Sequence, residues 1–281
     1  MQTLAATNGS SSSRDLRSLA RAIRVDVIQM IHSAKSSHIG SCLSIVDILA
    51  VLYGRILRID PASVKCPDRD RFILSKGHAC AAVYAVLAEL GFFPKSWLAT
   101  FYKDGSPLPG HITHYGIPGV EVSTGSLGHG LPLACGMALA GKRQGRPYRV
   151  FAILSDGECD EGSTLEAMLF AGHHKLDNLV AVVDYNKIQS IGRVSEVLDL
   201  HPFADKWIAC RWAVSEVDGH DIAALERAFT EASLQKDAPT CIIAHTIKGK
   251  GISFMEDKLL WHYRAPDEQE LQKALEELLY C

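Results

Sequence analysis

Runs of apolar residues along the chain follow two patterns, one typical of amphipathic helices and one of buried strands. From residue 16 to residue 31 apolar positions recur three or four apart, which predicts a helix. Further helices are predicted at residues 45–57, 76–91, 163–175, 222–235 and from Pro266 onward. Short, continuously apolar runs predict strands at residues 71–75, 149–154, 178–186, 212–217 and 240–246.

The order of these elements predicts an α/β fold. Strands and helices alternate at the spacing of β-α-β units, and continuously apolar strands are typical of a sheet covered on both faces. We therefore expect a doubly wound, mostly parallel sheet with helices on both faces, formed by residues 15–281 as one domain. Residues 1–14 are polar and lack the apolar core of a signal peptide, so we expect a disordered leader.

Two details of the chain sharpen this prediction. Ser44 and Asp47 resemble the start signals of the helix at 45–57, and Gly91 has the residue type that commonly follows a helix end. Residues 102–130 form a loop rich in Gly, Pro, His, Ser and Thr, which is long for a compact domain. An apolar segment follows it directly, so we expect this loop to be ordered and functional.

Composition and charge exclude several classes of protein. The chain has 281 residues, 47% of them hydrophobic, and a formal net charge of −3 with no basic stripe, which argues against a nucleic-acid partner. No apolar run approaches the roughly 18–20 residues that span a bilayer, so no membrane segment is expected. Its eight cysteines are scattered without a CxxC pair, which favours reduced thiols in a cytoplasmic protein.

Polar side chains stand at the ends of two consecutive predicted strands. Asp156 follows the first strand and Asn186 follows the second, and ligands of open parallel sheets bind beyond the carboxyl ends of strands. These side chains and a nearby backbone carbonyl would offer hard oxygen ligands for Mg²⁺ or Ca²⁺. Gly157 and the helix start near residue 162 would let backbone N–H groups approach a phosphate. The pattern predicts a diphosphate held by a metal. The alternative is that Asp156-Gly157 and Tyr185-Asn186 are ordinary turn sequences.

At these residues the sequence resembles the transketolase family. Asp156-Gly157, Glu161-Gly162, the segment AGHHKLDNL and Asn186 together resemble the thiamine diphosphate signature of transketolases. The resemblance extends from about residue 17 to residue 266. Its other blocks are SSHIGSCLS, LSKGHA, LPGHIT, GVEVSTGSLGHGLPLACGMALAGK, NKIQSIG, VDGHD and HTIKGKG.

The resemblance implies how the metal and the diphosphate are held. Asp156, Asn186 and the backbone carbonyl of Ile188 would bind Mg²⁺ or Ca²⁺, and the metal would hold thiamine diphosphate. The Gly157 N–H would touch a phosphate. His78 would hydrogen-bond phosphate or substrate and take part in catalysis; the alternative for His78 is a surface histidine at a helix start.

Further roles implied by the resemblance concern the path to the reactive carbon of the cofactor. His38 and His111 would line that path and exchange protons with substrate hydroxyls, which suits an imidazole near neutral pH. His262 would lie beside the phosphates, with a surface histidine as the alternative. Gly125 and Leu127 would approach the aminopyrimidine ring of the cofactor.

Glu161 and Ser155 lie on either side of the Asp156-Gly157 pair in the sequence. By resemblance Glu161 would serve catalysis and cofactor binding by contacting the activating glutamate of a neighbouring subunit; otherwise it is a first-turn glutamate favoured by the helix dipole. Ser155 stands where the family usually has glycine. A serine there tolerates fewer backbone conformations, and its hydroxyl could bond a phosphate or water.

The resemblance covers only the N-terminal domain of full-length transketolases, which implies the N-terminal subunit of a split enzyme. We expect a partner subunit with the pyrimidine-binding and C-terminal domains, an α₂β₂ assembly and a small sugar substrate. The predicted reaction moves a two-carbon ketol unit from a ketose, or ketose phosphate, to an acceptor. One alternative delivers the two-carbon unit to a lipoyl or carrier-protein thiol. Another is a non-catalytic thiamine diphosphate or nucleotide-binding module, which the full set of site residues argues against.

Overall fold

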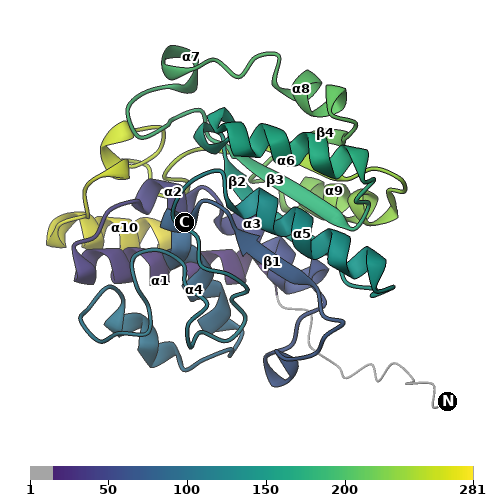
Figure 1. Ribbon diagram of the computed structural model, residues 1–281. Helices are drawn as coiled ribbons and strands as arrows, with labels where there is room; N and C mark the ends of the chain where they lie inside the picture. The colour runs from purple at the N-terminus through teal and green to yellow at the C-terminus, as the bar shows by residue number, and fades with distance from the viewer. Residues whose placement is uncertain (1–14, 281) are drawn as a thin grey trace.

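One parallel sheet forms the centre of the molecule (Figure 1). The structure is a computed structural model, and it describes residues 15–280. All four strand pairings are parallel, in the order β1-β2-β3-β5-β4. The strands are β1 (Arg71–Leu74), β2 (Val150–Ser155), β3 (Leu179–Tyr185), β4 (Ala213–Asp218) and β5 (Thr240–His245).

Helices cover both faces of this sheet, and each face has its own hydrophobic core. Alternate strand residues point to opposite faces, so Ile153 joins one core while Ala152 and Leu154 join the other. The first core contains side chains of α1 (Leu16–Ala34), α2 (Ile39–Leu43), α3 (Val46–Val51), α4 (Cys80–Glu89), α9 (Ile222–Leu234) and α10 (Glu268–Tyr280). The second contains those of α5 (Gly130–Arg143), α6 (Gly162–His173), α7 (Val194–Val197) and α8 (Phe203–Ala209). The predicted doubly wound fold is confirmed.

The strand patterns follow from position in the sheet. Strands β2 and β3 are buried at every residue, as their continuous apolar runs predict. Strand β4 pairs only with β5 and is half exposed, because it forms an edge of the sheet. Its weaker apolar run, residues 212–217, is nevertheless sufficient to identify it.

The predicted helix at residues 45–57 differs in detail. Its α-helical part, α3, begins at Val46, and residues Leu52–Ile56 form a π-helix. Ser44 does not cap this helix, because its hydroxyl bonds the carboxylate of Asp184 at 2.7 Å. The start signal at Ser44 and Asp47 was therefore wrong, since both side chains serve contacts with distant parts of the chain.

The next predicted helix is confirmed with a different first turn. Residues Gly77–Ala79 form a 3-10 turn before α4, and Gly91 follows the helix with a φ of 82°, as its residue type predicted. The predicted leader, residues 1–14, lies outside the described residues. No helix within residues 15–280 is long and apolar enough to cross a membrane.

The long loop between η4 (Lys95–Thr100) and α5 is folded back against the end of β1. The N–H of Ile112 donates to the carbonyl of Gly77 at 3.1 Å, and the N–H of Thr124 donates to the carbonyl of Ile112 at 3.2 Å. The Thr124 hydroxyl donates to the carbonyl of Leu74 at 2.6 Å. These bonds bring the glycine- and histidine-rich loop to the carboxyl edge of the sheet.

Candidate functional site

A cavity of about 230 Å³ opens at the carboxyl ends of β1, β2, β3 and β5. The strand ends meet there because parallel neighbours finish at the same edge. All predicted site residues except Glu161 line it, namely His38, His78, His111, Gly125, Leu127, Asp156, Gly157, Asn186, Ile188 and His262.

The two strand-end side chains are oriented by the backbone around them. Asp156 accepts hydrogen bonds from the N–H groups of Gly157 at 2.8 Å and Lys187 at 2.6 Å. The side-chain amide oxygen of Asn186 accepts a hydrogen bond from the N–H of Ile188 at 3.1 Å. This bond turns the oxygen toward the backbone that follows β3. Burial, and then the nearby charge of Asp184, raise the pKa of Asp156 to about 6. A cation beside Asp156 would offset both effects.

The donor set around Asp156 suits a hard divalent cation. Within residues 15–280 no group of three or more His, Cys, Asp or Glu side chains could hold a metal ion. The set here is instead mixed, with a carboxylate, the amide of Asn186 and the carbonyl of Ile188, which are oxygen types that Mg²⁺ and Ca²⁺ accept. The Ile188 carbonyl also accepts a hydrogen bond from the ammonium of Lys248 at 2.7 Å, which uses one of its two lone pairs and leaves the other for a cation.

Four histidines cluster on the other side of the cavity. The ring centroid of His38 lies 5.0 Å from that of His78, 4.8 Å from that of His262 and 5.9 Å from that of His111. The φ of His38 is 74°, a conformation that side-chain-bearing residues seldom adopt. The buried Nδ1 atoms of His38 and His262 have no hydrogen-bond partner. Such unpaired atoms are typical of a site that completes its bonds with a ligand.

Burial keeps these imidazoles neutral. Burial, followed by the charges of His111 and Lys248, lowers the pKa of His38 to about 4. Burial and then the charge of Lys248 lower the pKa of His262 to about 3, and burial alone lowers that of His111. At neutral pH each of these three rings is therefore uncharged.

A buried polar network below the cavity was missed by sequence reasoning. Asp184 is fully buried in β3 and accepts hydrogen bonds from Ser44, Lys76, Thr246 and the Asn186 amide nitrogen. Burial opposes its ionisation, but the Lys76 ammonium and these bonds hold the pKa of Asp184 below its ordinary value. Because the side-chain nitrogen of Asn186 donates to Asp184, the side-chain oxygen of Asn186 points away from Asp184 and toward the cavity. A charged residue inside an apolar strand was the signal available in the sequence.

Two further residues also received no role from the sequence. Lys248 lines the cavity, and burial followed by the charge of Lys76 lowers its pKa to about 8. Glu158 is fully buried and accepts the N–H of Gly128 at 2.9 Å, which ties the turn after β2 to the long loop. Ser155 accepts the N–H of Glu158 at 3.2 Å, so its hydroxyl is used within the turn.

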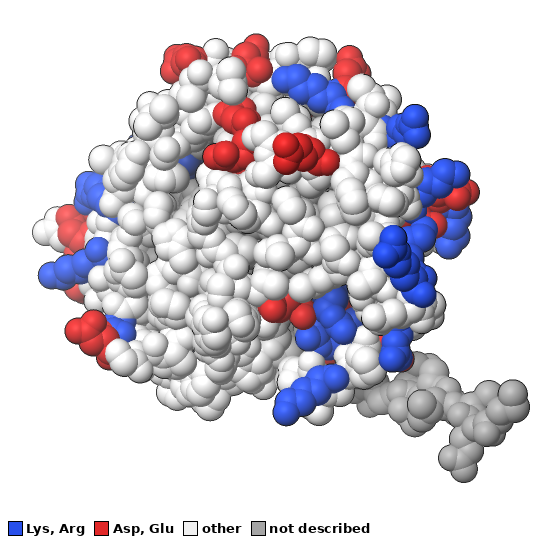
Figure 2. All heavy atoms as spheres, viewed as in Figure 1, with Lys and Arg blue, Asp and Glu red and all other residues white. Residues whose placement is uncertain are grey.

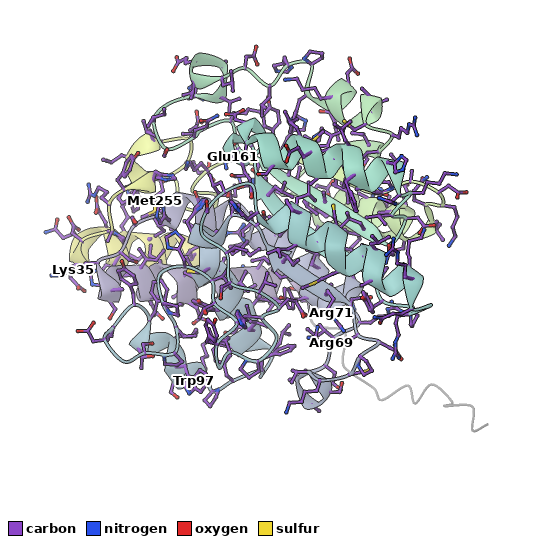
Figure 3. The ribbon with its side chains drawn as sticks, in the orientation of Figure 1. Lys35, Arg69, Arg71, Trp97, Glu161 and Met255 are labelled. Carbon is purple, nitrogen blue, oxygen red and sulfur yellow. The ribbon has the colours of Figure 1, made fainter. Side chains whose placement is uncertain are left out.

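Glu161 lies apart from the cavity. It precedes α6, is exposed, and makes no capping hydrogen bond with its side chain. Figure 3 shows it at the end of that helix, on the near face of the molecule. Its contact with another subunit stays a prediction.

Comparison with known proteins identifies the family. Residues 16–279 match the family described as "Transketolase, thiamine diphosphate binding domain". The chain belongs to this transketolase family. It is 42% identical to one of the subunits of the apulose-4-phosphate transketolase of Actinobacillus succinogenes, over 94% of this chain and 96% of that protein. It is also 42% identical to the 6-deoxy-6-sulfo-D-fructose transketolase subunit SqwG of a Clostridium species, with the same coverage.

A solved transketolase has the same fold. The transketolase of Leishmania mexicana superposes with a TM-score of 0.90 at 30% identity, over 94% of this chain but 41% of that chain. This chain thus spans about two fifths of that transketolase and nearly all of the separate transketolase subunits. The predicted family, the thiamine diphosphate cofactor and the transketolase-type subunit are confirmed, and these relatives favour that subunit over one that delivers carbon to a protein thiol.

Proposed function

We propose that this chain is the diphosphate-binding subunit of a two-subunit transketolase, which transfers a two-carbon ketol unit from a ketose to an acceptor. The observation that carries the proposal is one cavity that gathers ten predicted residues at the sheet edge. When bound, thiamine diphosphate supplies a nucleophilic thiazolium carbon and an electron sink for carbon–carbon bond cleavage.

The acidic side of the cavity would hold the diphosphate through a metal. Asp156, Asn186 and the Ile188 carbonyl would bind Mg²⁺ or Ca²⁺, a role supported by their oxygen chemistry and by the elevated pKa of Asp156. Lys248 would neutralise a further phosphate charge from beside Ile188. The Gly157 N–H, which now donates to Asp156, would gain a phosphate acceptor nearby.

The histidine side would act on the substrate. His38 and His111 would accept and return protons at ketose hydroxyls, a role supported by their position in the cavity and by rings that are uncharged at neutral pH. His78 and His262 are less exposed than His111, so they would hydrogen-bond the phosphates or the substrate. His78 has its pKa lowered well below the ordinary value by burial and then by Lys76, which suits a neutral hydrogen-bonding role.

A partner subunit would complete the site, and we propose an α₂β₂ assembly. Two relatives of about the same length are named as transketolase subunits, which supports a separate partner. The partner would supply the pyrimidine-binding half and the carboxylate that Glu161 contacts. The seven described cysteines are all free, which is typical of a reducing compartment and supports a cytoplasmic location.

The test is a ketol-transfer assay on this chain alone, on the candidate partner alone, and on the mixture. The ketose donors should include apulose 4-phosphate and 6-deoxy-6-sulfofructose, because these sugars appear in the names of two relatives. We expect activity only in the mixture, and expect Asp156→Ala to remove both activity and the stabilisation by thiamine diphosphate with Mg²⁺. Full turnover by this chain alone would contradict the two-subunit proposal.

A further inference from the structure

The loop after β5 places Lys248 in the cavity. Lys248 is 2% exposed, and its ammonium reaches the Ile188 carbonyl at 2.7 Å. Gly249 and Gly251 have φ angles of 82° and 97°, so the loop makes two left-handed bends next to this lysine. Glycine permits these bends without fixing them, so contacts between the loop backbone and other groups help to hold its conformation.

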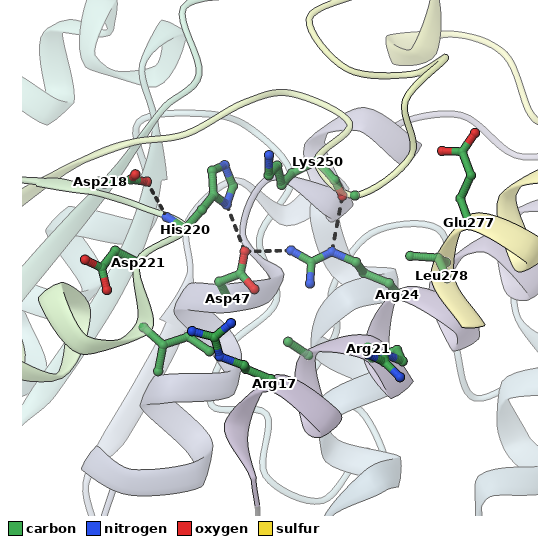
Figure 4. Close-up of a pocket in the computed structure, with 13 residues that line it drawn as sticks. Arg17, Arg21, Arg24, Asp47, Asp218, His220, Asp221, Lys250, Glu277 and Leu278 are labelled. Carbon is green, nitrogen blue, oxygen red and sulfur yellow. Dashed lines mark hydrogen bonds and ion pairs between the residues drawn. The ribbon is translucent and has the colours of Figure 1, made fainter. Parts of the chain in front are cut away.

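Asp47 lies on the outer side of the loop and bonds two side chains, those of Arg24 and His220 (Figure 4). One oxygen of Asp47 accepts Nη2 of Arg24 at 2.6 Å and Nδ1 of His220 at 2.8 Å. Burial opposes ionisation of Asp47, but the bond from His220 and the charge of Arg24 hold its pKa below the ordinary value. The three side chains come from α3, α1 and the turn after β4, and they line a separate cleft of about 660 Å³.

Each partner of Asp47 also holds a backbone group beside Lys248. His220 Nε2 accepts the N–H of Ile247 at 2.8 Å, and Arg24 Nε donates to the carbonyl of Lys250 at 3.2 Å. Because Nε2 of His220 is an acceptor, Nδ1 carries the proton that is donated to Asp47.

Gly251 permits the close approach of Arg24. A Cβ at this position would lie 2.8 Å from Arg24 Nε. The residue before Lys248 and the second residue after it are therefore fixed by one carboxylate.

We propose that Asp47, Arg24 and His220 are positioning residues, which set the affinity of the site for diphosphate by holding Lys248 from outside the cavity. The inference rests on the proposed function, because it requires a diphosphate beside Lys248. None of the three residues lines the cavity, so each would act only through the loop.

Magnesium pyrophosphate is a suitable probe, since it needs only the diphosphate half of the site. Calorimetric titration of the full chain would compare His220→Leu, which loses both hydrogen bonds, with His220→Gln, whose amide can keep one donor and one acceptor. We expect His220→Leu to weaken pyrophosphate binding roughly 10-fold, the loss typical of one to two hydrogen bonds. His220→Gln should bind within about threefold of the unsubstituted chain.

A double-mutant cycle with Lys248→Met separates positioning from general damage. If His220 acts through Lys248, His220→Leu should weaken binding no further in the Lys248→Met background. An equal loss in both backgrounds, or no loss in either, would overturn the inference. Failure of the unsubstituted chain to bind pyrophosphate would instead contradict the proposed site itself.

A second variant covers the case in which His220→Leu does not fold. Arg24→Lys keeps a cation for Asp47 but lacks the Nε that bonds the Lys250 carbonyl. The same cycle with Lys248→Met then applies, with the same expected and contrary results.

Discussion

The four clustered histidines differ in how far each is withdrawn from solvent. His262 is buried and His78 is half-buried, whereas His111 is exposed at the mouth of the cavity, in the loop that returns to β1. The aromatic carbon Cδ2 of His111 lies 3.6 Å from the position that a Cβ on Gly125 would take. We therefore expect His111 to meet an entering substrate rather than to hold the diphosphate.

We expect His111→Ala to slow turnover roughly 10²-fold, within the usual range for a general acid or base. Affinity for thiamine diphosphate should change little, because the proposed diphosphate contacts lie elsewhere in the cavity. Steady-state kinetics and calorimetric titration of the assembled enzyme would measure the two effects. His114→Ala is the control, since His114 bonds Ser123 outside the cavity at 2.8 Å. A loss of affinity as large as the loss of rate would assign His111 to the cofactor instead.

The turn before α4 packs against the long loop between η4 and α5. A Cβ on Gly77 would lie 2.4 Å from the carbonyl oxygen of Thr124, so the long loop can pack there only against glycine. That loop carries His111 and Gly125 into the cavity. The packing of one glycine thereby sets the position of both.

We predict that Gly77→Ala reduces thiamine diphosphate affinity by about 10-fold or more, since the backbone of Thr124 must move, at a cost typical of overpacking. The matched control is Gly91→Ala, because Gly91 has a φ of 82° and open space around it. That control should lower the free energy of unfolding by roughly 1 kcal/mol and leave affinity unchanged. Urea unfolding and calorimetry would distinguish the two variants. Equal affinities would show that the loop position does not depend on this contact.

Asp26 makes the contact between α1 and η4 sensitive to pH. Burial, opposed by a hydrogen bond from Lys95, raises the pKa of Asp26 to about 6. A carboxyl with a higher pKa in the folded protein binds a proton on folding. It therefore stabilises the fold most below about pH 4, the ordinary pKa range, and this contribution is lost as the pH rises through about 6.

We accordingly expect the Asp26→Asn variant at pH 8 to have a melting temperature at least as high as that of the unsubstituted chain. The melting temperature of the variant relative to the unsubstituted chain should fall as the pH drops through about 6 toward 4, where Asp26 is itself neutral. Thermal melting across this pH range would measure it, with Asp68→Asn as an exposed control. A variant that is less stable at pH 8 than at pH 5, relative to the unsubstituted chain, would contradict the prediction.

The limits of sequence reasoning also appear at the level of elements. The apolar runs in the sequence locate the ends of β2 and β3, because the end of a strand depends on local sequence. Asp156 and Asn186 could therefore be predicted as residues at the edge of the sheet. The role of Asp47 could not be predicted in this way, because its partners Arg24 and His220 are 23 and 173 residues away in the sequence. Asp184 and Lys248 were missed for the same reason, as only the fold brings their partners together.

One face of the whole molecule is suited to a partner. Figure 2 shows a face that is mostly uncharged across its centre, and α5 and α6 lie on this side in Figure 1. Four large apolar side chains are exposed on these two helices, namely Leu133, Leu165, Leu169 and Phe170. Glu161 directly precedes α6 on the same face, so the predicted contact with another subunit would lie beside this apolar surface.

We expect Leu169→Glu to prevent assembly with the partner subunit, because a charge would be buried in an apolar interface. Leu169 is 61% exposed, and Leu234 on α9, which is 73% exposed, provides the control variant Leu234→Glu. Light scattering of the mixed subunits should show the full assembly for the control and separate chains for Leu169→Glu. Normal assembly of Leu169→Glu would place the interface elsewhere.

The uncharged state of the histidine cluster makes binding of an anion in this cavity sensitive to pH. Burial keeps His38 and His262 uncharged, with pKa values of about 4 and 3, but a diphosphate would bring several negative charges beside them. Binding of the anion should then raise the pKa values of these imidazoles, and any imidazole that gains a proton takes it from solution. Calorimetric heats of binding at pH 6 should consequently differ between cacodylate and Bis-Tris buffers, whose ionisation enthalpies are unequal, and the difference reports how many protons each site takes up.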